Sequence, residues 1–391
     1  MLAALPKPET ERIQLSVAHE RILTESINAR IDVPPFDNSA MDGYAVKAAD
    51  VARANASAPV RLRIRGKVAA GENATTHISS GECVRLFTGS PVPHGADAVV
   101  MQEDTKPDPG APDGILICDS ARPGENVRRR GSDVQQGAVL ATAGDALTAG
   151  RIGLLGACGI REVTVGKRPR VGLLATGSEL REAGQPLAHG QIYESNRSML
   201  AALIEQAGAI PQKYPLVVDS LAATQQALDT ALRECDVVVT SGGVSVGEMD
   251  FVKVAFEKLG GELQFWKVAI RPGKPFVFGG CRGKFLFGLP GNPISAFVTY
   301  LVLVRPALLH WQGATNIGLP AESGALAEPL ANPGDRRHFM RVRLDDSGQV
   351  HSAGQQASHA LLPLAIAQGL VDVPPKTTLA AGKIVAVLRW Q

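Results

Sequence analysis

The stretch from Thr240 to Asp250, TSGGVSVGEMD, contains the residue types from which anion-binding sites are built. It follows an apolar, strand-like run and precedes a helical pattern, which indicates a strand, a glycine-rich turn and the start of a helix. Glycines can adopt positive φ and let backbone N–H groups approach a ligand, serines add hydroxyl donors, and a helix N-terminus adds partial positive charge. The candidate residues for binding a phosphate are Ser241, Gly242, Gly243, Ser245 and Gly247.

The same stretch argues against two common nucleotide-binding classes. It lacks the Lys-Ser/Thr ending of a P-loop and the spacing of a dinucleotide fingerprint, so neither an ordinary NTPase nor an NAD enzyme is indicated. Glu248 and Asp250 instead place carboxylates beside the anion site, which is unfavourable unless a cation or a reacting group lies between them. The alternative interpretation is a solvated helix cap with acidic residues in the first turn.

Two further turns, each after a strand-like run, contain basic residues or prolines. The segment 266–275, WKVAIRPGKP, holds Lys267, Arg271 and Lys274 around a Pro-Gly turn. The segment 288–293, GLPGNP, supplies the candidate substrate-binding residues Pro290, Gly291, Asn292 and Pro293. Both turns would meet at the carboxyl edge of a parallel sheet, where open α/β sheets bind ligands. Basic residues there suit a polyanionic substrate, although lysines and arginines near turns can also be solvated bystanders.

Acidic residues follow two earlier strand-like runs. Glu179 lies in TGSEL, and Asp219 ends the run PLVVD. With Asp250 they would reach one edge of the sheet, and three converging carboxylates favour a divalent cation or nucleotide site over three separate helix caps.

A second group of reactive residue types lies far upstream. The segment 36–46, FDNSAMDGYAV, gathers acidic and hydroxyl side chains around Asp42, although the same residue types also form turns. Thr88 lies in a TGSPVP turn, and Asp133 follows three adjacent arginines at 128–130. A strand over those arginines would direct alternate side chains to opposite faces, so one of them could face a pocket.

The hydrophobic pattern of the sequence, which predicts the elements that position these residues, changes at Val171. Strand-like runs VGLLAT, PLVVD and DVVVT alternate with helical patterns over Ser195–Ala207, Ser220–Glu234 and Ile294–Leu309. This alternation predicts a doubly wound, mainly parallel sheet with helices on both faces.

The regions on either side have other patterns. Pro59–Gly137 contains short strands separated by turns and predicts an all-β region, and Leu319–Gln391 predicts a small antiparallel β domain. Ile13–Ala29 and Leu147–Cys158 have helical patterns, and Arg161–Val165 is typical of a strand.

The composition excludes several classes of protein. The chain has 391 residues, 45% hydrophobic and 20% charged, which predicts a globular protein with more than one domain. The net charge of +2 is too small to indicate electrostatic binding to nucleic acid or to an anionic membrane. The five cysteines are widely separated without a CxxC pair, so we expect free thiols rather than zinc or disulfides. The N-terminus has no signal pattern, and the longest apolar run, Phe297–Val304, is too short to span a bilayer. We therefore expect a cytoplasmic protein with no nucleic-acid or membrane partner.

Six motifs, in order and over nearly the whole chain, carry a family resemblance: FDNSAMDGYAV, RLFTGSPVP, NVRRRGSD, TSGGVSVGEMD, RPGKP and GLPGNP. They resemble the molybdopterin molybdenumtransferase family, called MoeA in bacteria and represented in animals by the E domain of gephyrin. The resemblance implies a multidomain α/β plus β fold in an elongated homodimer. Its parts would be a discontinuous stem over residues 1–30 and 138–168, an inserted β domain over 31–137, a doubly wound α/β molybdopterin-binding domain over 169–316 and a small C-terminal β-barrel domain over 317–391.

The activity implied by the resemblance is insertion of molybdate into adenylylated molybdopterin with Mg²⁺, releasing AMP and molybdenum cofactor. Matched motif by motif, the implied catalytic residues are Asp42, Thr88, Asp133, Glu179, Asp219, Asp250, Lys267 and Lys274, with Glu179 and Asp250 as metal ligands. In a dimer, the first three would face the others across the subunit interface. Magnesium on the carboxylates would neutralise the pyrophosphate of the substrate. Molybdopterin adenylyltransferase and downstream molybdoenzyme chaperones would be partners.

Three positions depart from the family pattern. Ser178 replaces one carboxylate of the common TGDEL, and Arg271 stands where many relatives have lysine, which changes a point donor into a planar fork. Leu362 and Pro363 replace small polar residues, which weakens the case for a molybdate contact there.

Two other functions stay open. Molybdopterin adenylyltransferase shares the SGGVS-type turn but usually stands as a single small domain. A non-catalytic molybdopterin-binding scaffold would use the same fold, yet it need not keep Asp42, Asp250 and Lys274, all of which are present.

Overall fold

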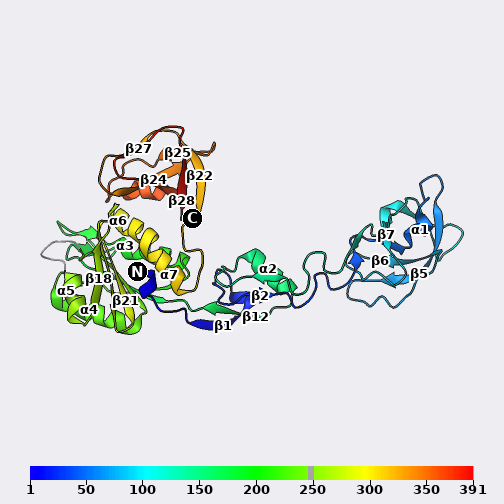
Figure 1. Ribbon diagram of the computed structural model, residues 1–391, viewed down its shortest axis with the longest axis horizontal. Coiled ribbons are helices and arrows are strands. Elements are labelled where there is room, and N and C mark those ends of the chain that lie inside the picture. Colours follow the sequence, from blue (N-terminus) through cyan, green and yellow to red (C-terminus); the bar gives the residue numbers. More distant parts are fainter. Residues whose placement is uncertain (245–250, 391) are drawn as a thin grey trace.

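The computed structural model describes residues 1–244 and 251–390 of the chain. The chain is elongated: the α/β domain and the C-terminal β domain lie at one end, a stem lies in the middle, and the inserted β domain lies at the other end (Figure 1). Residues of the inserted domain are therefore far from the α/β domain of the same chain. The boundaries drawn between these units from sequence remain predictions.

The stem is built from two separate segments of chain. Strand β1 pairs antiparallel with β12, and β2 pairs with β11, so each segment completes the other. Its elements are β1 (Thr10–Gln14), β2 (Ile27–Asn28), β11 (Val139–Ala141), α2 (Ala149–Ala157) and β12 (Glu162–Gly166). Leu23, Leu147 and Leu155 are fully buried between the two segments. The helix predicted over residues 147–158 and the strand predicted over 161–165 are confirmed.

The helix predicted over residues 13–29 is wrong. That segment contains the end of β1, a 3₁₀ turn at Leu15–Val17 and β2. Val17 is exposed whereas Ile22 and Leu23 are buried, so the apolar residues do not share one helical face. Pairing with β11 and β12 satisfies the backbone of this segment, and that tertiary pairing overrides a weak helical spacing.

The inserted domain is a six-stranded sheet in the order β7-β4-β6-β5-β9-β8. Successive residues of its strands enter two different apolar clusters: Val46 and Val100 pack on one side of the sheet, and Ala45 and Val99 pack on the other. The elements are β3 (Asn38–Ser39), β4 (Gly43–Val46), α1 (Ala48–Val51), β5 (Val60–Val68), β6 (Glu82–Leu86), β7 (Ala98–Met101), a 3₁₀ turn (Gln102–Asp104), β8 (Thr105–Pro107), β9 (Gly114–Ile117) and β10 (Val127–Arg128). The predicted β region is confirmed.

The α/β domain contains a six-stranded sheet in the order β16-β13-β17-β21-β20-β18. The first four strands are parallel and the last two are antiparallel, so the sheet is mixed at one edge. Its elements are β13 (Arg170–Ala175), β14 (Leu180–Arg181), β15 (Ile192–Tyr193), α3 (Asn196–Gln206), β16 (Ile210–Lys213), α4 (Leu221–Glu234), β17 (Val237–Ser241), α5 (Phe251–Lys258), β18 (Glu262–Lys267), β20 (Pro275–Cys281) and β21 (Lys284–Leu289).

Helices cover both faces of this sheet, as the doubly wound prediction requires. Residues of α3 and of the helical run after β21 form one core cluster, and residues of α4 and α5 form another. All five residues of β17 are buried because the strand lies between these two layers. The helices predicted over 195–207 and 220–234 and the strands from Val171 and over 236–240 are confirmed.

One predicted strand is misplaced. The strand expected at residues 215–219 lies earlier, as β16 at Ile210–Lys213. Pro215 has no N–H for a continuing ladder, and only Val217 forms a bridge, with Thr176. The segment after β16 therefore runs along the carboxyl edge of the sheet, which is where it delivers Asp219.

The last helical run of the domain is α6 (Pro293–Thr299), a π-helical segment (Tyr300–Val304) and α7 (Arg305–Trp311). It confirms the helix predicted over 294–309, and the π segment precedes Pro306, which has no N–H for the α-helical ladder. The run Pro293–Trp311 is long and apolar enough to cross a membrane by length and composition, but 61% of that window is buried inside the protein, as in a core helix.

The C-terminal domain is a closed barrel. Strands pair in the cycle β24-β25-β22-β28-β26 and back to β24, which confirms the small β-barrel that the resemblance implies. The prediction of an all-antiparallel domain is wrong at one pair, because β22 and β25 are parallel. The elements are β22 (Ala321–Leu326), β23 (Leu330–Asn332), β24 (Arg337–Leu344), β25 (Gln349–Ser352), α8 (Leu361–Ile366), β26 (Gly369–Val373), β27 (Thr377–Leu379) and β28 (Ile384–Arg389). Strand β19 (Ile270–Arg271) of the α/β domain pairs with β24 and joins the two domains.

His338, on β24, is 2% exposed, and neither of its ring nitrogens has a hydrogen-bond partner among the described residues. Burial, and then the positive charges of Arg271, Arg341 and Arg336, lower the pKa of His338 from 6.5 to about 4. The imidazole is therefore neutral in the folded protein at neutral pH.

This lowered pKa predicts an acid sensitivity of the C-terminal barrel. The unfolded chain binds a proton at His338 below pH 6.5 and the folded chain only near pH 4, so stability is lost as the pH falls between these values. The expected loss is about 3 kcal/mol. His338→Phe cannot titrate, and thermal unfolding at pH 7 and pH 4.5 should show a smaller acid shift for the variant. An equal shift in both proteins would contradict the assignment.

Candidate active site

Three parallel strands, β13, β17 and β21, end at the same edge of the sheet, and two adjoining clefts open there. The smaller cleft has a volume of about 350 Å³ and the larger about 560 Å³. They share the lining residues Thr176, Glu179, Gly291 and Asn292. Because the walls are shared, one elongated ligand can occupy both clefts.

The glycine turn follows β17 and lines the smaller cleft. Gly242 and Gly243 have φ values of +91° and +68°, which favour glycine. A Cβ atom on Gly242 would lie 2.7 Å from the carbonyl oxygen of Thr176, and one on Gly243 would lie 2.8 Å from the hydroxyl of the same residue. The turn therefore packs its backbone directly against the end of β13. Ser245, Gly247 and Asp250 lie outside the described residues.

Asn196 ties the glycine turn to the second turn, and the sequence analysis missed it. Its side-chain Nδ2 donates to the Ser241 hydroxyl at 2.7 Å and to the Gly291 carbonyl at 2.7 Å. Asn196 is buried and also lines the larger cleft, while its Oδ1 has no partner among the described residues. From the sequence alone, an asparagine at the start of a helix is interpreted as a helix cap. Only the fold shows that Asn196 bridges two loops.

The remaining predicted residues of the second turn line the clefts. Pro290 and Gly291 line the smaller cleft, and Pro293 lines the larger one. Asn292 lines both clefts and donates to the Ser358 hydroxyl of the C-terminal domain at 3.2 Å. The C-terminal domain is therefore hydrogen-bonded to the wall of the site.

Replacing Gly243 by valine should weaken the binding of a phosphate-containing ligand. The added Cβ would lie 2.7 Å from Val252 Cγ2 as well as against Thr176, and the left-handed backbone would be strained. We expect binding to fall by roughly tenfold or more, with a loss of stability of about 2 kcal/mol. Isothermal calorimetry and thermal unfolding measure the two effects.

Gly260→Val is the matched control for this change. Gly260 also has a positive φ, of +83°, but a Cβ there meets no atom within 4 Å. The control should lose stability through backbone strain while keeping its affinity. Equal affinity of Gly243→Val and the parent would remove this turn from the site.

Two predicted carboxylates lie in the clefts. Glu179 is exposed and lines both, and Asp219 lines the smaller one. Asp219 Oδ2 accepts from the Ser178 backbone N–H at 2.9 Å, and the Asp219 N–H donates to the Ser178 hydroxyl at 3.1 Å. Ser178 thus positions Asp219 through these two hydrogen bonds. Glu179 does not take part in them.

These carboxylates fit a magnesium ion that keeps open ligand positions. Among the described residues, no group of three or more His, Cys, Asp or Glu side chains could hold a metal. Magnesium in phosphate-processing sites takes one or two carboxylates and completes its shell with water and substrate phosphate. Glu179 and Asp219 supply such a set of donors.

The predicted basic residues Lys267, Arg271 and Lys274 line neither cleft, although their segment leads into the smaller one. Lys267 ends β18, and Lys274 lies immediately before Pro275, which lines that cleft. The Val268 N–H donates to the Lys274 carbonyl at 3.1 Å, so the segment between the two lysines forms a tight loop. Arg271, in that loop, pairs through β19 with the C-terminal barrel.

Asp42 and Thr88 form a close pair in the inserted domain. The backbone N–H of Thr88 donates to Asp42 Oδ1 at 2.7 Å, and its hydroxyl donates to the same oxygen at 2.8 Å. These two bonds are the main reason that the pKa of Asp42 is lowered. Asp42 precedes β4 and Thr88 follows β6, so the pair lies in the inserted domain at the other end of the chain from the clefts (Figure 1). The exposed Asp133 lies close to Cys158 of the stem instead, so one chain brings neither the pair nor Asp133 together with Glu179.

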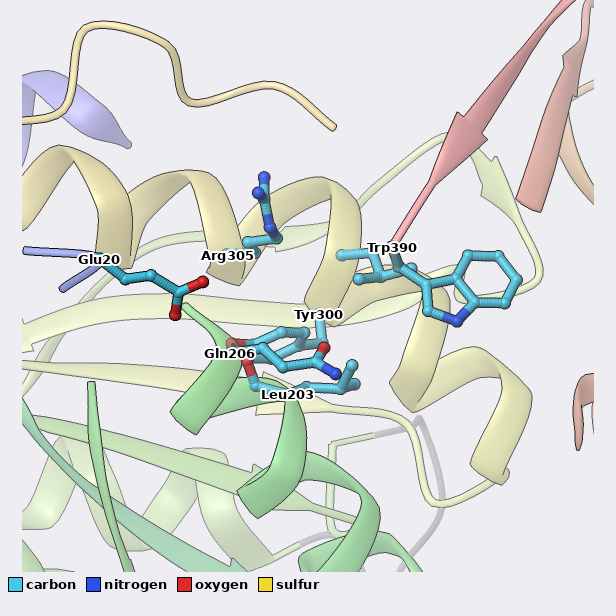
Figure 2. A pocket seen from close by; sticks show the side chains of 7 residues that line it. Glu20, Leu203, Gln206, Tyr300, Arg305 and Trp390 are labelled. Atoms are coloured by element: carbon cyan, nitrogen blue, oxygen red, sulfur yellow. Dashed lines mark hydrogen bonds between the residues drawn. The ribbon is translucent and has the colours of Figure 1, made fainter. Parts of the chain in front are cut away.

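Another cavity, of about 240 Å³, lies away from the sheet edge and contains none of the predicted site residues (Figure 2). The Tyr300 hydroxyl there donates to the Leu203 carbonyl at 2.8 Å, and Arg305 donates to the carbonyl groups of Ile317 and Gly318. Because these polar groups are already paired within the fold, we assign the cavity no part in the site.

Three family models match the chain in succession. The MoeA N-terminal region (domain I and II) matches residues 1–159, the probable molybdopterin binding domain matches 172–310, and the MoeA C-terminal region (domain IV) matches 323–390. The clefts lie within the second of these regions.

Relatives match nearly the whole chain. It is 41% identical over 366 residues to a molybdopterin molybdenumtransferase of Haemophilus influenzae, covering 92% of this chain and 88% of that one. It is 40% identical over 377 residues to molybdopterin molybdenumtransferase 2 of Mycobacterium tuberculosis, covering 95% and 92%. A solved molybdopterin biosynthesis MoeA protein from Pyrococcus horikoshii OT3 matches with a TM-score of 0.83 at 29% identity, covering 99% and 97%. This chain therefore belongs to the MoeA family of molybdopterin molybdenumtransferases.

Proposed function

We propose that this protein inserts molybdate into adenylylated molybdopterin in the presence of Mg²⁺ and releases AMP and molybdenum cofactor. The observation that carries the proposal is the pair of adjoining clefts at the carboxyl edge of the sheet, with the glycine turn and two carboxylates in their walls. A substrate with two ring systems joined through phosphates needs an elongated site with anion-binding groups near its centre. The centre of such a substrate would lie where the two clefts share the lining residues Thr176 and Gly291.

The chain's own residues supply binding and orientation. The Gly242 N–H already donates to the Leu289 carbonyl at 3.1 Å, so the Gly243 N–H would donate to a substrate phosphate. Asn196 would hold that turn against the second one. Lys274 and Arg271 would bind the molybdate dianion electrostatically. Glu179 and Asp219 would hold the magnesium ion, which when bound would neutralise the pyrophosphate and polarise the bond that is cleaved.

We further propose that the working unit is a homodimer with composite sites. Asp42 and Thr88 lie far from the clefts of their own chain, so only a second copy could bring them to Glu179. Asp133 of the same copy lies near Cys158 of the stem, so we propose it as a separate contributor to the site. A supply of adenylylated substrate implies molybdopterin adenylyltransferase as an upstream partner, and molybdoenzyme chaperones would accept the product. We infer a cytoplasmic location, which agrees with the five free cysteines.

The alternatives have less support. An adenylyltransferase corresponds to the α/β domain alone, whereas the family models extend over the stem, the inserted domain and the barrel. A scaffold would not need the Asp42–Thr88 pair or the carboxylates of the clefts.

Incubation of the purified protein with adenylylated molybdopterin, Mg²⁺ and molybdate tests the proposal. We expect AMP release that depends on molybdate and Mg²⁺ together. Formation of adenylylated molybdopterin from ATP and molybdopterin would support the adenylyltransferase instead. Tight binding of molybdopterin without any turnover would indicate the scaffold.

A further inference from the structure

Arg197, the second residue of α3, is a buried arginine whose partners come from separate segments of the chain. Its side chain is 5% exposed, and that of Glu194 is 4% exposed. Arg197 Nε donates to Glu194 Oε2 at 2.9 Å, and Nη2 donates to Glu182 Oε1 at 2.7 Å. Nη1 donates to the carbonyl of Tyr214. Each of the three guanidinium nitrogens therefore has a partner.

Two of these partners lie at the ends of a loop that has no apolar packing to hold it. The loop over residues 182–190 is exposed at every position. A short parallel ladder, β14 with β15, joins its two ends, and in it the Ile192 N–H donates to the Glu179 carbonyl at 3.0 Å. A ladder of two residue pairs is marginally stable by itself. The ion pairs of Arg197 therefore decide how firmly this loop is held.

The segments that Arg197 joins also carry the two carboxylates of the clefts. Glu179 lies just before the loop. A Cβ atom on Gly177 would lie 2.6 Å from Glu179 Oε2, so this carboxylate folds back over the turn at Gly177. Asp219 ends the segment that begins at Tyr214, and it is hydrogen-bonded to the same turn. A displacement of either segment would therefore move one carboxylate relative to the other.

We propose that Arg197 is a positioning residue: by joining the loop 182–190 to the segment 214–219, it sets the separation of Glu179 and Asp219 and so their capacity to hold one divalent cation. Arg197 lines neither cleft, so it acts only through the groups that it holds. The inference rests on the proposed function, because it assigns these carboxylates to magnesium. Magnesium demands near-ideal octahedral geometry, so a small shift of one carboxylate weakens its binding.

Arg21 in the stem is the matched control for a purely structural role. Its side chain is 8% exposed, and it donates to Glu11 at 2.5 Å and to the Gly166 carbonyl at 2.7 Å. Arg21 lines neither cleft. Replacement by lysine at either position keeps the charge but loses the planar fork of donors. Arg197→Lys and Arg21→Lys should therefore both lower the thermal stability of the protein.

Binding of Mn²⁺ to the full-length protein, followed through the electron paramagnetic resonance signal of the free ion, tests the inference without turnover. Mn²⁺ prefers the same oxygen donors as Mg²⁺. Arg197→Lys should weaken Mn²⁺ binding roughly tenfold, whereas Arg21→Lys should bind Mn²⁺ like the parent. Glu182→Gln removes a partner whose side chain is 51% exposed and leaves the buried pair with Glu194 in place. It should weaken Mn²⁺ binding severalfold.

Hydrogen exchange measures the loop itself. The Ile192 amide, which is bonded across the ladder, should exchange roughly tenfold faster in Arg197→Lys, because the ladder opens more often when the ion pairs are weakened. Glu182→Gln should show a smaller change in the same direction. Arg21→Lys should leave the exchange of this amide unchanged.

The outcomes separate this inference from the proposed function. Weaker Mn²⁺ binding and faster exchange in Arg197→Lys, with neither change in Arg21→Lys, support the positioning role. Parental Mn²⁺ affinity in Arg197→Lys, or an equal loss in both variants, overturns it and leaves the reaction standing if the parent releases AMP. A parent protein that binds no Mn²⁺ also overturns it. A parent that binds Mn²⁺ but releases no AMP overturns the reaction, and the effect of Arg197→Lys on Mn²⁺ affinity then still decides the positioning role.

Discussion

Two inactive variants, Asp42→Ala and Glu179→Ala, should regain activity when their chains are mixed. Each variant alone is expected to lose roughly a hundredfold or more in AMP release, as for removal of one charged group from a preorganised site. Half of randomly mixed dimers are hybrids, and each hybrid contains one composite site with both residues intact. The mixture should therefore recover about a quarter of the parental activity. AMP release measured after exchange of the tagged chains checks this value.

A second mixture supplies the control. Asp42→Ala and Thr88→Ala both lie in the inserted domain, so every site in their hybrid dimers lacks one of the two groups. That mixture should stay at the level of the separate variants. If hybrids of Asp42→Ala and Glu179→Ala form but remain inactive, the site lies within one subunit. If the chains are monomeric by analytical ultracentrifugation, the homodimer proposal fails before the site is tested.

The variant Glu179→Gln should still bind the substrate but should lose most of its catalytic activity. Glu179 lines both clefts, and Ser178 directs its own hydrogen bonds to Asp219 instead. Glutamine preserves the shape of the side chain but not its charge, so we expect magnesium-dependent AMP release to fall roughly a hundredfold. Affinity for adenylylated molybdopterin should change only severalfold. A magnesium titration of AMP release, together with calorimetric binding, measures both quantities, and partial rescue at high magnesium is expected.

Glu205→Gln is the matched control, because Glu205 is exposed on α3 and lines neither cleft. Its turnover should equal that of the parent. If Glu179→Gln also turns over at the parental rate across the titration, Glu179 neither binds magnesium nor contributes charge to the reaction.

The local sequence was enough to predict the role of a residue where that role depends on the conformation of its own backbone. Gly242 and Gly243 follow a buried strand and were expected to be able to adopt positive φ, and both do so. The order of β strands and helices after Val171 predicted which turns reach the carboxyl edge, because parallel strands all end on that side. The sequence also determined the family, through six motifs that lie in the inserted domain and the α/β domain.

Tertiary structure alone decided the partners of those residues. The segment 13–29 is not a helix, because its strand residues pair with β11 and β12 more than a hundred residues away, and no local pattern records those partners. Asn196 joins two loops, and Ser178 positions Asp219, through contacts that neither spacing nor propensity predicts. The separation of Asp42 and Thr88 from the clefts is likewise a property of the stem, which holds the inserted domain at the far end of the chain (Figure 1).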